Sequence, residues 1–182
     1  LPRVLFDRHR ERTVLCGSAS KAYAMTGWRC GWTMAPKELI AAGNVIQGHS
    51  TSNVASITQK AALAALMGPQ DAVTVMLDEY RARRDSVHAW LTANPLIRCV
   101  RPKGAFYLMP DVSDLLSPNG IRTSAQFAQG LLDEHRVAVT PGEGVDAPGP
   151  NRISYATAVE DRREGAARIL RFPDSLNPAH AG

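Results

Sequence analysis

The stretch GSASKAYAMTGWRCGW, Gly17 to Trp32, is the part of this sequence that decides its fold and its chemistry. It places one lysine, Lys21, among small residues, and Arg29 follows it behind the triplet Thr-Gly-Trp. A lysine becomes a nucleophile only after it loses its proton, and burial or a nearby cation lowers its pKa from about 10.4. A lysine in a loop rich in serine and alanine is most often a surface charge. Composition alone therefore leaves Lys21 open as either a solvated or a catalytic residue.

The neighbours of Lys21 are suited to a flat, phosphate-bearing ligand. Small residues let a ring approach the backbone, and Gly27 permits a backbone conformation that other residues avoid. The hydroxyls of Ser18 and Ser20 can donate hydrogen bonds to phosphate oxygens, and the guanidinium of Arg29 can donate two parallel hydrogen bonds to the same group. A neutral lysine beside such a site is able to form a Schiff base with pyridoxal phosphate.

Length and composition indicate an ordinary globular chain. The 182 residues suffice for one large domain or two small ones, with 45% hydrophobic and 21% charged residues. The net charge is +4, but the basic residues are scattered, which disfavours a nucleic-acid partner. No apolar run has the length of a membrane span, so no membrane partner is expected. The first residue is Leu1, and the opening sequence reads like the middle of a protein, so a truncated chain is expected.

Cysteine and histidine usage disfavours disulfides and metals. The three cysteines lack CxxC spacing, and the five histidines are dispersed without an HxxxH or HxH pair. No metal site is therefore expected. The odd number of cysteines fits a reducing cytoplasm.

The sequence predicts two strands followed by three helices in the first half of the chain. Two short β-branched or aromatic runs are expected to be strands, 12–17 and 28–34. A helix is expected to begin at Pro36, and a second, capped by Asn53, to run through Leu66. The longest periodic segment, 71–93, predicts an amphipathic helix that Asn94 and Pro95 end.

The second half has a different sequence pattern, which predicts short strands that alternate with helices. The expected strands are 97–100, 105–110, 137–140 and 152–156, and the expected helices are 123–134 and 159–170. The tail from Phe172 is expected to be unstructured. A boundary inside the long helix, near residue 80, divides the chain into two predicted domains, 1–80 and 81–182. The fold class is α/β.

The string SASKAYAMTGWRCGW resembles the lysine motif of the fold-type I, pyridoxal-phosphate-dependent aminotransferases of class I/II, and most closely the aspartate aminotransferase-like subgroup. The resemblance implies that 1–80 is the end of the cofactor-binding large domain and that 81–182 is the α+β small C-terminal domain. It makes Lys21 the Schiff-base lysine and proton shuttle. Ser18 and Arg29 would hold the cofactor phosphate with help from Ser20, and Tyr23 would lie near the substrate.

Further segments extend the resemblance over residues 10–172. RPKGAFYLMPDVS, 101–113, is similar to a small-domain strand in which Phe106 would wall the substrate pocket. NRISYAT, 151–157, is similar to the strand whose arginine grips the substrate α-carboxylate, which gives Arg152 that role. VAVTPGEGV also matches, although Val145 replaces the usual phenylalanine. QGHSTSNVAS resembles a dimer-interface segment, in which Thr51 and Ser52 would reach the partner's cofactor phosphate.

The resemblance implies transamination between an L-amino acid, with aspartate as first choice, and a 2-oxo acid, in a cytoplasmic homodimer. Aromatic amino acids and alanine stay open as substrates. The family's phosphate turn, ring-stacking aromatic and pyridine-binding aspartate would all precede residue 1, so this chain alone is expected to be inactive. Three alternatives remain: a β-lyase or synthase on the same scaffold, a non-catalytic fragment or regulator domain, and a basic binding module suggested by the pI of about 9.2.

Overall fold

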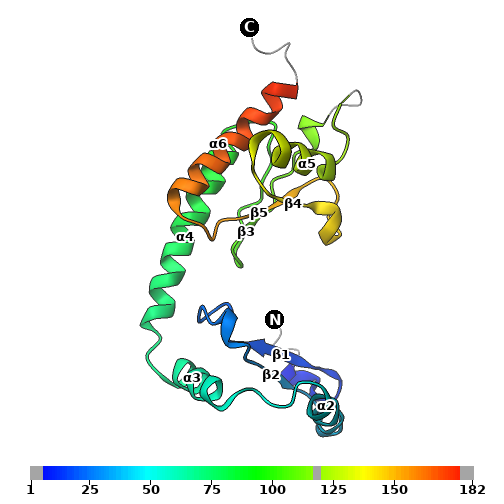
Figure 1. Ribbon diagram of the computed structural model, residues 1–182, viewed down its shortest axis with the longest axis vertical. Helices are drawn as coiled ribbons and strands as arrows, with labels where there is room; N and C mark the ends of the chain where they lie inside the picture. The colour runs from blue at the N-terminus through cyan, green and yellow to red at the C-terminus, as the bar shows by residue number, and fades with distance from the viewer. Residues whose placement is uncertain (1–5, 117–119, 177–182) are drawn as a thin grey trace. The chain divides into compact units, whose positions relative to one another are not determined.

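The computed structural model describes residues 6–116 and 120–176, and the chain divides into two compact units, Leu1–Val75 and Met76–Gly182. Figure 1 labels their helices and strands. Each unit combines helices with a small antiparallel sheet. The assignment of 1–80 to a large domain and 81–182 to a small domain stays a prediction.

The sheet of the first unit consists of the two strands that flank the Lys21 stretch. β1 (Leu15–Ser18) pairs antiparallel with β2 (Gly31–Met34), and Gly17 lies opposite Trp32. A Cβ on Gly17 would lie 2.3 Å from Trp32 Nε1, so only glycine lets the indole pack on the backbone here. Two 3₁₀ helices also belong to this unit, η1 (Arg10–Arg12) and η2 (Thr26–Trp28).

Two α-helices follow the strands. α2 (Lys37–Ser50) begins directly after Pro36, as predicted, and α3 (Ser56–Met67) ends before Gly68. The predicted cap at Asn53 is wrong. Ala55 occupies the N-cap position with no side-chain hydrogen bond, because the backbone stays extended through Ala55 (ψ 140°) before the helix begins.

The second unit holds a three-stranded antiparallel sheet with the order β3-β5-β4. Its strands are β3 (Tyr107–Leu108), β4 (Thr140–Pro141) and β5 (Asn151–Ser154). Its helices are α4 (Asp71–Leu91), which begins in the first unit, α5 (Ser124–His135), α6 (Val159–Leu176), and the 3₁₀ helices η3 (Ser113–Leu115) and η4 (Gly142–Val145). The predicted strand 97–100 forms only a single bridge, Arg98 with Asp111. Prolines beside the strands, such as Pro110 and Pro150, donate no N–H, which keeps the pairing short.

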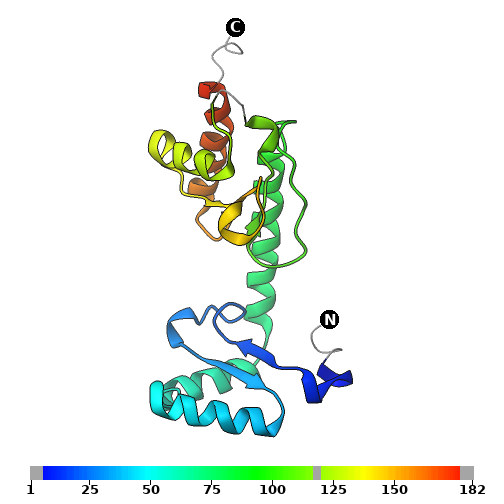
Figure 2. The ribbon, with the colours of Figure 1, turned by 90° about the vertical axis from the view of Figure 1, so that its right-hand side faces the viewer.

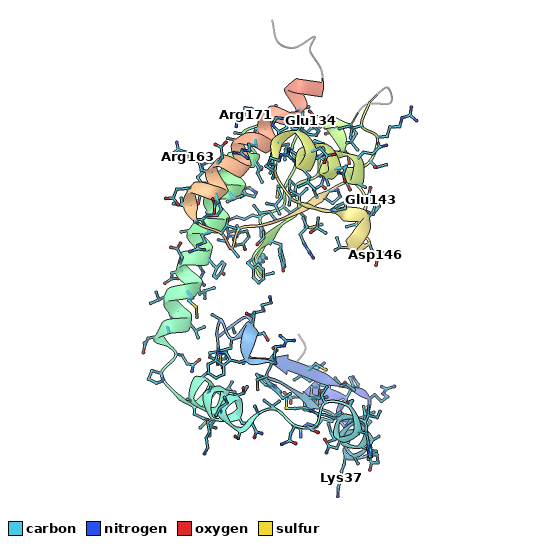
Figure 3. All side chains as sticks on the ribbon, in the orientation of Figure 1. Lys37, Glu134, Glu143, Asp146, Arg163 and Arg171 are labelled. Carbon is cyan, nitrogen blue, oxygen red and sulfur yellow. The ribbon has the colours of Figure 1, made fainter. Side chains whose placement is uncertain are left out.

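The core of the second unit lies where its helices and sheet meet. Figure 2 shows α6 between α5 and α4, and side chains from all three helices join Leu108 of β3 in one buried cluster. The buried face of α6 carries Ala166, Ile169 and Phe172. The exposed residues Arg163 and Arg171 project from the same helix away from this core (Figure 3).

The expectation of an unstructured tail from Phe172 is wrong for the described part of that tail. α6 continues through Leu176 with Pro173 inside it, and Phe172 is fully buried. The ring of Phe172 packs against Phe127, with their centroids 5.0 Å apart. Residues 166, 169 and 172 follow one another at the three-residue spacing of one helix face, which is the sequence signal that the helix continues to this point. The predicted tail residues 177–182 lie outside the described residues.

Candidate functional site

The connection between β1 and β2 carries all four residues predicted to hold the cofactor. Ser18 ends β1, and its hydroxyl lies 2.9 Å from the Ser20 hydroxyl and accepts a 3.0 Å hydrogen bond from the Ser20 backbone N–H. Lys21 follows in a turn that the Ala24 N–H closes by donating to Lys21 O at 3.2 Å. Ala19, between the serines, is fully buried, whereas Lys21 is exposed. The backbone of this turn therefore presents the lysine and two hydroxyls within four residues.

Arg29 is placed by an unusual backbone conformation. Its φ of 53° and ψ of 49° lie in the left-handed region, where the chain turns from η2 into β2. Its Nη1 donates to Thr26 O at 2.8 Å, which anchors one arm of the guanidinium to the preceding turn. No carboxylate of residues 6–116 and 120–173 forms an ion pair with Arg29. This exposed guanidinium can bind an anionic ligand.

Tyr23 is tied to the neighbouring connection between α3 and α4. Its hydroxyl donates to Gln70 Oε1 at 3.1 Å, and the Gln70 side-chain amide donates to Ala65 O and Gly68 O. The hydroxyl is therefore committed to a contact within the first unit. Its predicted position near the substrate stays a prediction.

Arg29 shares a depression of about 450 Å³ with the predicted dimer-interface segment. Thr51 and Ser52, at the end of α2, line it together with Trp28. Ser52 also has a positive φ, 57°, and its N–H donates to Gln47 O at 2.8 Å. The structure thus places Arg29, Thr51 and Ser52 around one depression. The predicted reach of Thr51 and Ser52 to the partner's cofactor phosphate stays a prediction.

Arg152 lies in β5, the central strand of the second unit's sheet. Its Nη2 donates to Thr140 Oγ1 of β4 at 3.4 Å, and its guanidinium carbon lies 4.6 Å from the centroid of the Tyr107 ring on β3. The side chain is half-buried, and no carboxylate in the described part of the chain pairs with it. Arg152 therefore presents a guanidinium held by neutral groups, which suits a ligand carboxylate.

Phe106 lies next to Tyr107, with the ring centroids 4.4 Å apart, and 6.2 Å from the ring of Tyr80. Its predicted place in the substrate wall stays a prediction. Sequence reasoning missed two neighbouring tyrosines: the ring of Tyr107 contacts Arg152, and the hydroxyl of Tyr155 donates to Ala105 O. The alternation of side chains along a strand could have indicated the first contact, because it places every second residue of paired strands on one face.

Tyr155 secures the chain just before β3 with two hydrogen bonds. Its backbone N–H donates to Phe106 O at 3.1 Å, and its hydroxyl donates to Ala105 O at 2.9 Å. Ala105 has a φ of 60°, a left-handed conformation that is unfavourable for alanine. Burial of the Tyr155 side chain raises the pKa of its phenol. The neutral phenol is the form that donates to Ala105 O.

The donors of the β1–β2 connection fit the phosphate of pyridoxal 5'-phosphate. Two hydroxyls 2.9 Å apart and a guanidinium without a carboxylate partner among the described residues supply neutral and cationic hydrogen-bond donors.

The described residues contain no group of three or more His, Cys, Asp or Glu side chains that could hold a metal ion. Across 6–116 and 120–176, no helix combines the length and apolar character that a bilayer crossing requires.

Residues 2–169 match the protein family described as aminotransferase class I and II. The chain is 40% identical over 166 residues to the aspartate aminotransferase of Geobacillus stearothermophilus, which covers 91% of this chain and 42% of that protein. It is 44% identical over 172 residues to the aspartate/prephenate aminotransferase of Cereibacter sphaeroides, covering 92% of this chain and 43% of that protein.

A solved structure agrees with these sequence matches. The aspartate aminotransferase from Rhizobium meliloti is 40% identical and superposes with a TM-score of 0.87, covering 92% of this chain and 43% of that chain. The chain spans less than half the length of the relatives it matches. The predicted resemblance and the predicted α/β fold are confirmed by these matches.

Proposed function

The chain belongs to the aminotransferase class I and II family, and on this premise we propose that it carries the lysine and carboxylate-binding residues of a pyridoxal 5'-phosphate-dependent aminotransferase. The enzyme would move an amino group between an L-amino acid and a 2-oxo acid. The observation that supports the proposal is the β1–β2 connection, which carries Ser18, Ser20, Lys21 and Arg29 at the positions of the family's motif.

Each site residue has a role that its chemistry supports. The hydroxyls of Ser18 and Ser20 and the guanidinium of Arg29 would bind the cofactor phosphate. The guanidinium of Arg152 would bind the substrate α-carboxylate through two parallel N–H donors and so orient the bond from Cα to hydrogen. Pyridoxal phosphate, when bound, supplies an electron sink for the pair of electrons that this bond leaves at Cα.

Lys21 would serve in two ways. Its Nζ would attach the cofactor covalently in the resting enzyme. As a neutral amine, Nζ would also accept the proton that leaves the substrate Cα, which is general base catalysis, and return a proton as a general acid. Phe106 and Tyr23 would border the substrate. Thr51 and Ser52, which share a depression with Arg29, would contribute hydroxyls at a subunit interface.

Aspartate is the proposed amino donor, since the names of the two relatives compared above both include it. The second name also includes prephenate. The proposed assembly is a homodimer. The proposed location is the cytoplasm, which agrees with the three free cysteines, Cys16, Cys30 and Cys99.

The test measures aspartate-dependent conversion of 2-oxoglutarate by the holoenzyme that contains this chain, with oxaloacetate detected by a coupled NADH assay. Lys21→Ala should abolish turnover and remove the absorbance near the visible edge that a lysine-linked cofactor gives. Survival of that band would show that the cofactor is not attached to Lys21. Formation of pyruvate from a β-substituted amino acid, without amino transfer, would instead support a β-lyase.

A second assay uses the 182-residue chain alone. We expect no useful transamination from it. Its described residues include proposed hydrogen-bond donors to the cofactor phosphate and to the substrate carboxylate, but none of them is assigned to the pyridine nitrogen of the cofactor. Robust turnover by this chain would overturn that expectation.

A further inference from the structure

The guanidinium of Arg152 lies between two strands that flank its own. Thr140 on β4 accepts from Nη2 at 3.4 Å, and the ring of Tyr107 on β3 lies 4.6 Å from the guanidinium carbon. The Thr140 contact is long for a hydrogen bond between these groups, whereas 4.6 Å lies well inside the range of roughly 6 Å for a cation–π contact. Tyr107 is not among the residues to which the motifs assign a role.

The sheet register explains why these two residues meet. Tyr107 pairs with Ser154, so Arg152, two residues before Ser154 on β5, is its diagonal neighbour on the same face. Leu108 and Ile153, which alternate with them, pair on the other face, and Leu108 is fully buried in the core. The contact is therefore set by the pairing of β3 with β5 and is not an incidental approach of two flexible side chains.

We propose that Tyr107 is a positioning residue for substrate binding: its ring holds the Arg152 guanidinium in place to receive the substrate α-carboxylate. The inference rests on the proposed function for the role of Arg152. A ring face attracts the cation through its quadrupole but carries no net charge. An acidic partner would instead neutralise the arginine and compete with the substrate, so an aromatic neighbour orients the guanidinium and leaves its charge available.

The ring of Tyr107 is itself restrained. Phe106 stacks beside it at 4.4 Å between centroids, and Phe106 O accepts from the backbone N–H of Tyr155. The Tyr155 hydroxyl holds Ala105 O immediately upstream. These contacts limit the motion of the chain that carries Tyr107, so the ring can act as a stable platform for Arg152.

The experiment compares Tyr107→Leu, which removes the ring, with Tyr107→Phe, which keeps it, in the holoenzyme that contains this chain. Tyr107→Met is a second ring-less variant for the case that the leucine variant does not fold. We would measure KM and kcat with aspartate and 2-oxoglutarate, and the Kd of maleate, a dicarboxylate probe, by calorimetry. The ring-less variants should raise KM and the maleate Kd about fivefold, as expected for loss of a cation–π contact.

Tyr107→Phe should stay close to the wild-type values, and kcat should change by less than about twofold in every variant, because the lost contact serves binding. A ring-less variant with unchanged KM and maleate Kd would overturn the inference, as would a loss in Tyr107→Phe equal to that in Tyr107→Leu. A fall in kcat at constant KM would also overturn it.

Failure of the proposed function would be recognised separately. A wild-type holoenzyme that does not transaminate contradicts that function, and the maleate Kd then decides on Tyr107 alone. A fivefold weaker Kd in the ring-less variants would support the inference. An unchanged Kd, or no maleate binding by the wild type, would overturn it.

Discussion

Gly130→Ala is a substitution for which helix propensity and packing predict opposite results. Gly130 lies within α5, and alanine is favoured over glycine in a helix interior by about 0.5–1 kcal/mol. A Cβ at this position, however, would lie 2.4 Å from Cζ of Phe172 and 3.2–3.3 Å from its two Cε atoms. The first distance is far inside van der Waals contact, so the ring or the helix must move.

The surroundings of Phe172 decide how much that movement costs. The ring is fully buried, with Phe127 5.0 Å away and His135 5.4 Å away between centroids, so it has no open space into which to retreat. Overpacking of this kind typically costs about 1–3 kcal/mol. After subtraction of the helix-propensity gain, Gly130→Ala should lower the free energy of unfolding by about 1 kcal/mol, within a range of about 0–2.5 kcal/mol.

Urea unfolding of the full-length protein, followed by far-ultraviolet circular dichroism, measures this difference. Gly165→Ala in α6 is the matched control, because a Cβ there meets no heavy atom within 4 Å outside its own helix and should stabilise by about 0.5–1 kcal/mol. In a Phe172→Leu background the clash is reduced, so Gly130→Ala should become neutral or stabilising. Equal stabilisation by Gly130→Ala and Gly165→Ala in the wild-type background would refute the packing argument.

Three further substitutions or measurements test other parts of the chain. Tyr155→Phe leaves Ala105 O without its donor and should lower the free energy of unfolding by about 1–2 kcal/mol in the same urea assay. Because burial raises the pKa of Tyr155, its contribution to stability is present below pH 10 and lost as pH rises through the raised value, so the phenylalanine variant should lose less stability in alkali. The hydrogen bond from Ser124 lowers the pKa of Glu143, so that contribution is present above about pH 4.5 and lost on acidification; Glu143→Gln should flatten the fall in melting temperature below that pH. The isolated 182-residue chain should bind the dye ANS more strongly than the full-length enzyme, because large apolar side chains of the first unit, such as Trp28, Ile46 and Met67, are exposed.

The stretch that we propose to bind the cofactor could be singled out from the sequence because its residues lie close together in the chain. Ser18, Ser20 and Lys21 lie within four residues, and Arg29 joins them through a short connection between two strands that pair with each other. Gly17 leaves room for the indole of Trp32, and Gly31 leaves room for the carbonyl oxygen of Gly17; both glycines belong to the stretch Gly17 to Trp32. A sequence pattern describes such a stretch well, since its members are close together in the chain.

The contacts that the sequence did not reveal depend on longer-range packing. The stacking of Arg152 on Tyr107 requires the register of β3 against β5, which joins residues 45 positions apart. Burial of Phe172 requires α5 to lie beside α6 and to carry a glycine at the point of contact. A proline inside a helix is unfavourable, yet α6 continues through Pro173 and Phe172 is fully buried.

The residues proposed to bind the cofactor and the arginine proposed to bind the substrate carboxylate are therefore held by different means. Lys21 and the phosphate donors are held by the backbone of one connection, with hydrogen bonds such as Ala24 N–H to Lys21 O and Ser20 N–H to the Ser18 hydroxyl. Arg152 is held chiefly by side chains, the ring of Tyr107 and the hydroxyl of Thr140. Substitutions that preserve backbone geometry should leave the phosphate donors in place, whereas carboxylate binding should respond to single side-chain changes in the neighbouring strands. Variation in substrate affinity among otherwise similar chains is thus expected to arise more readily around Arg152 than around Lys21.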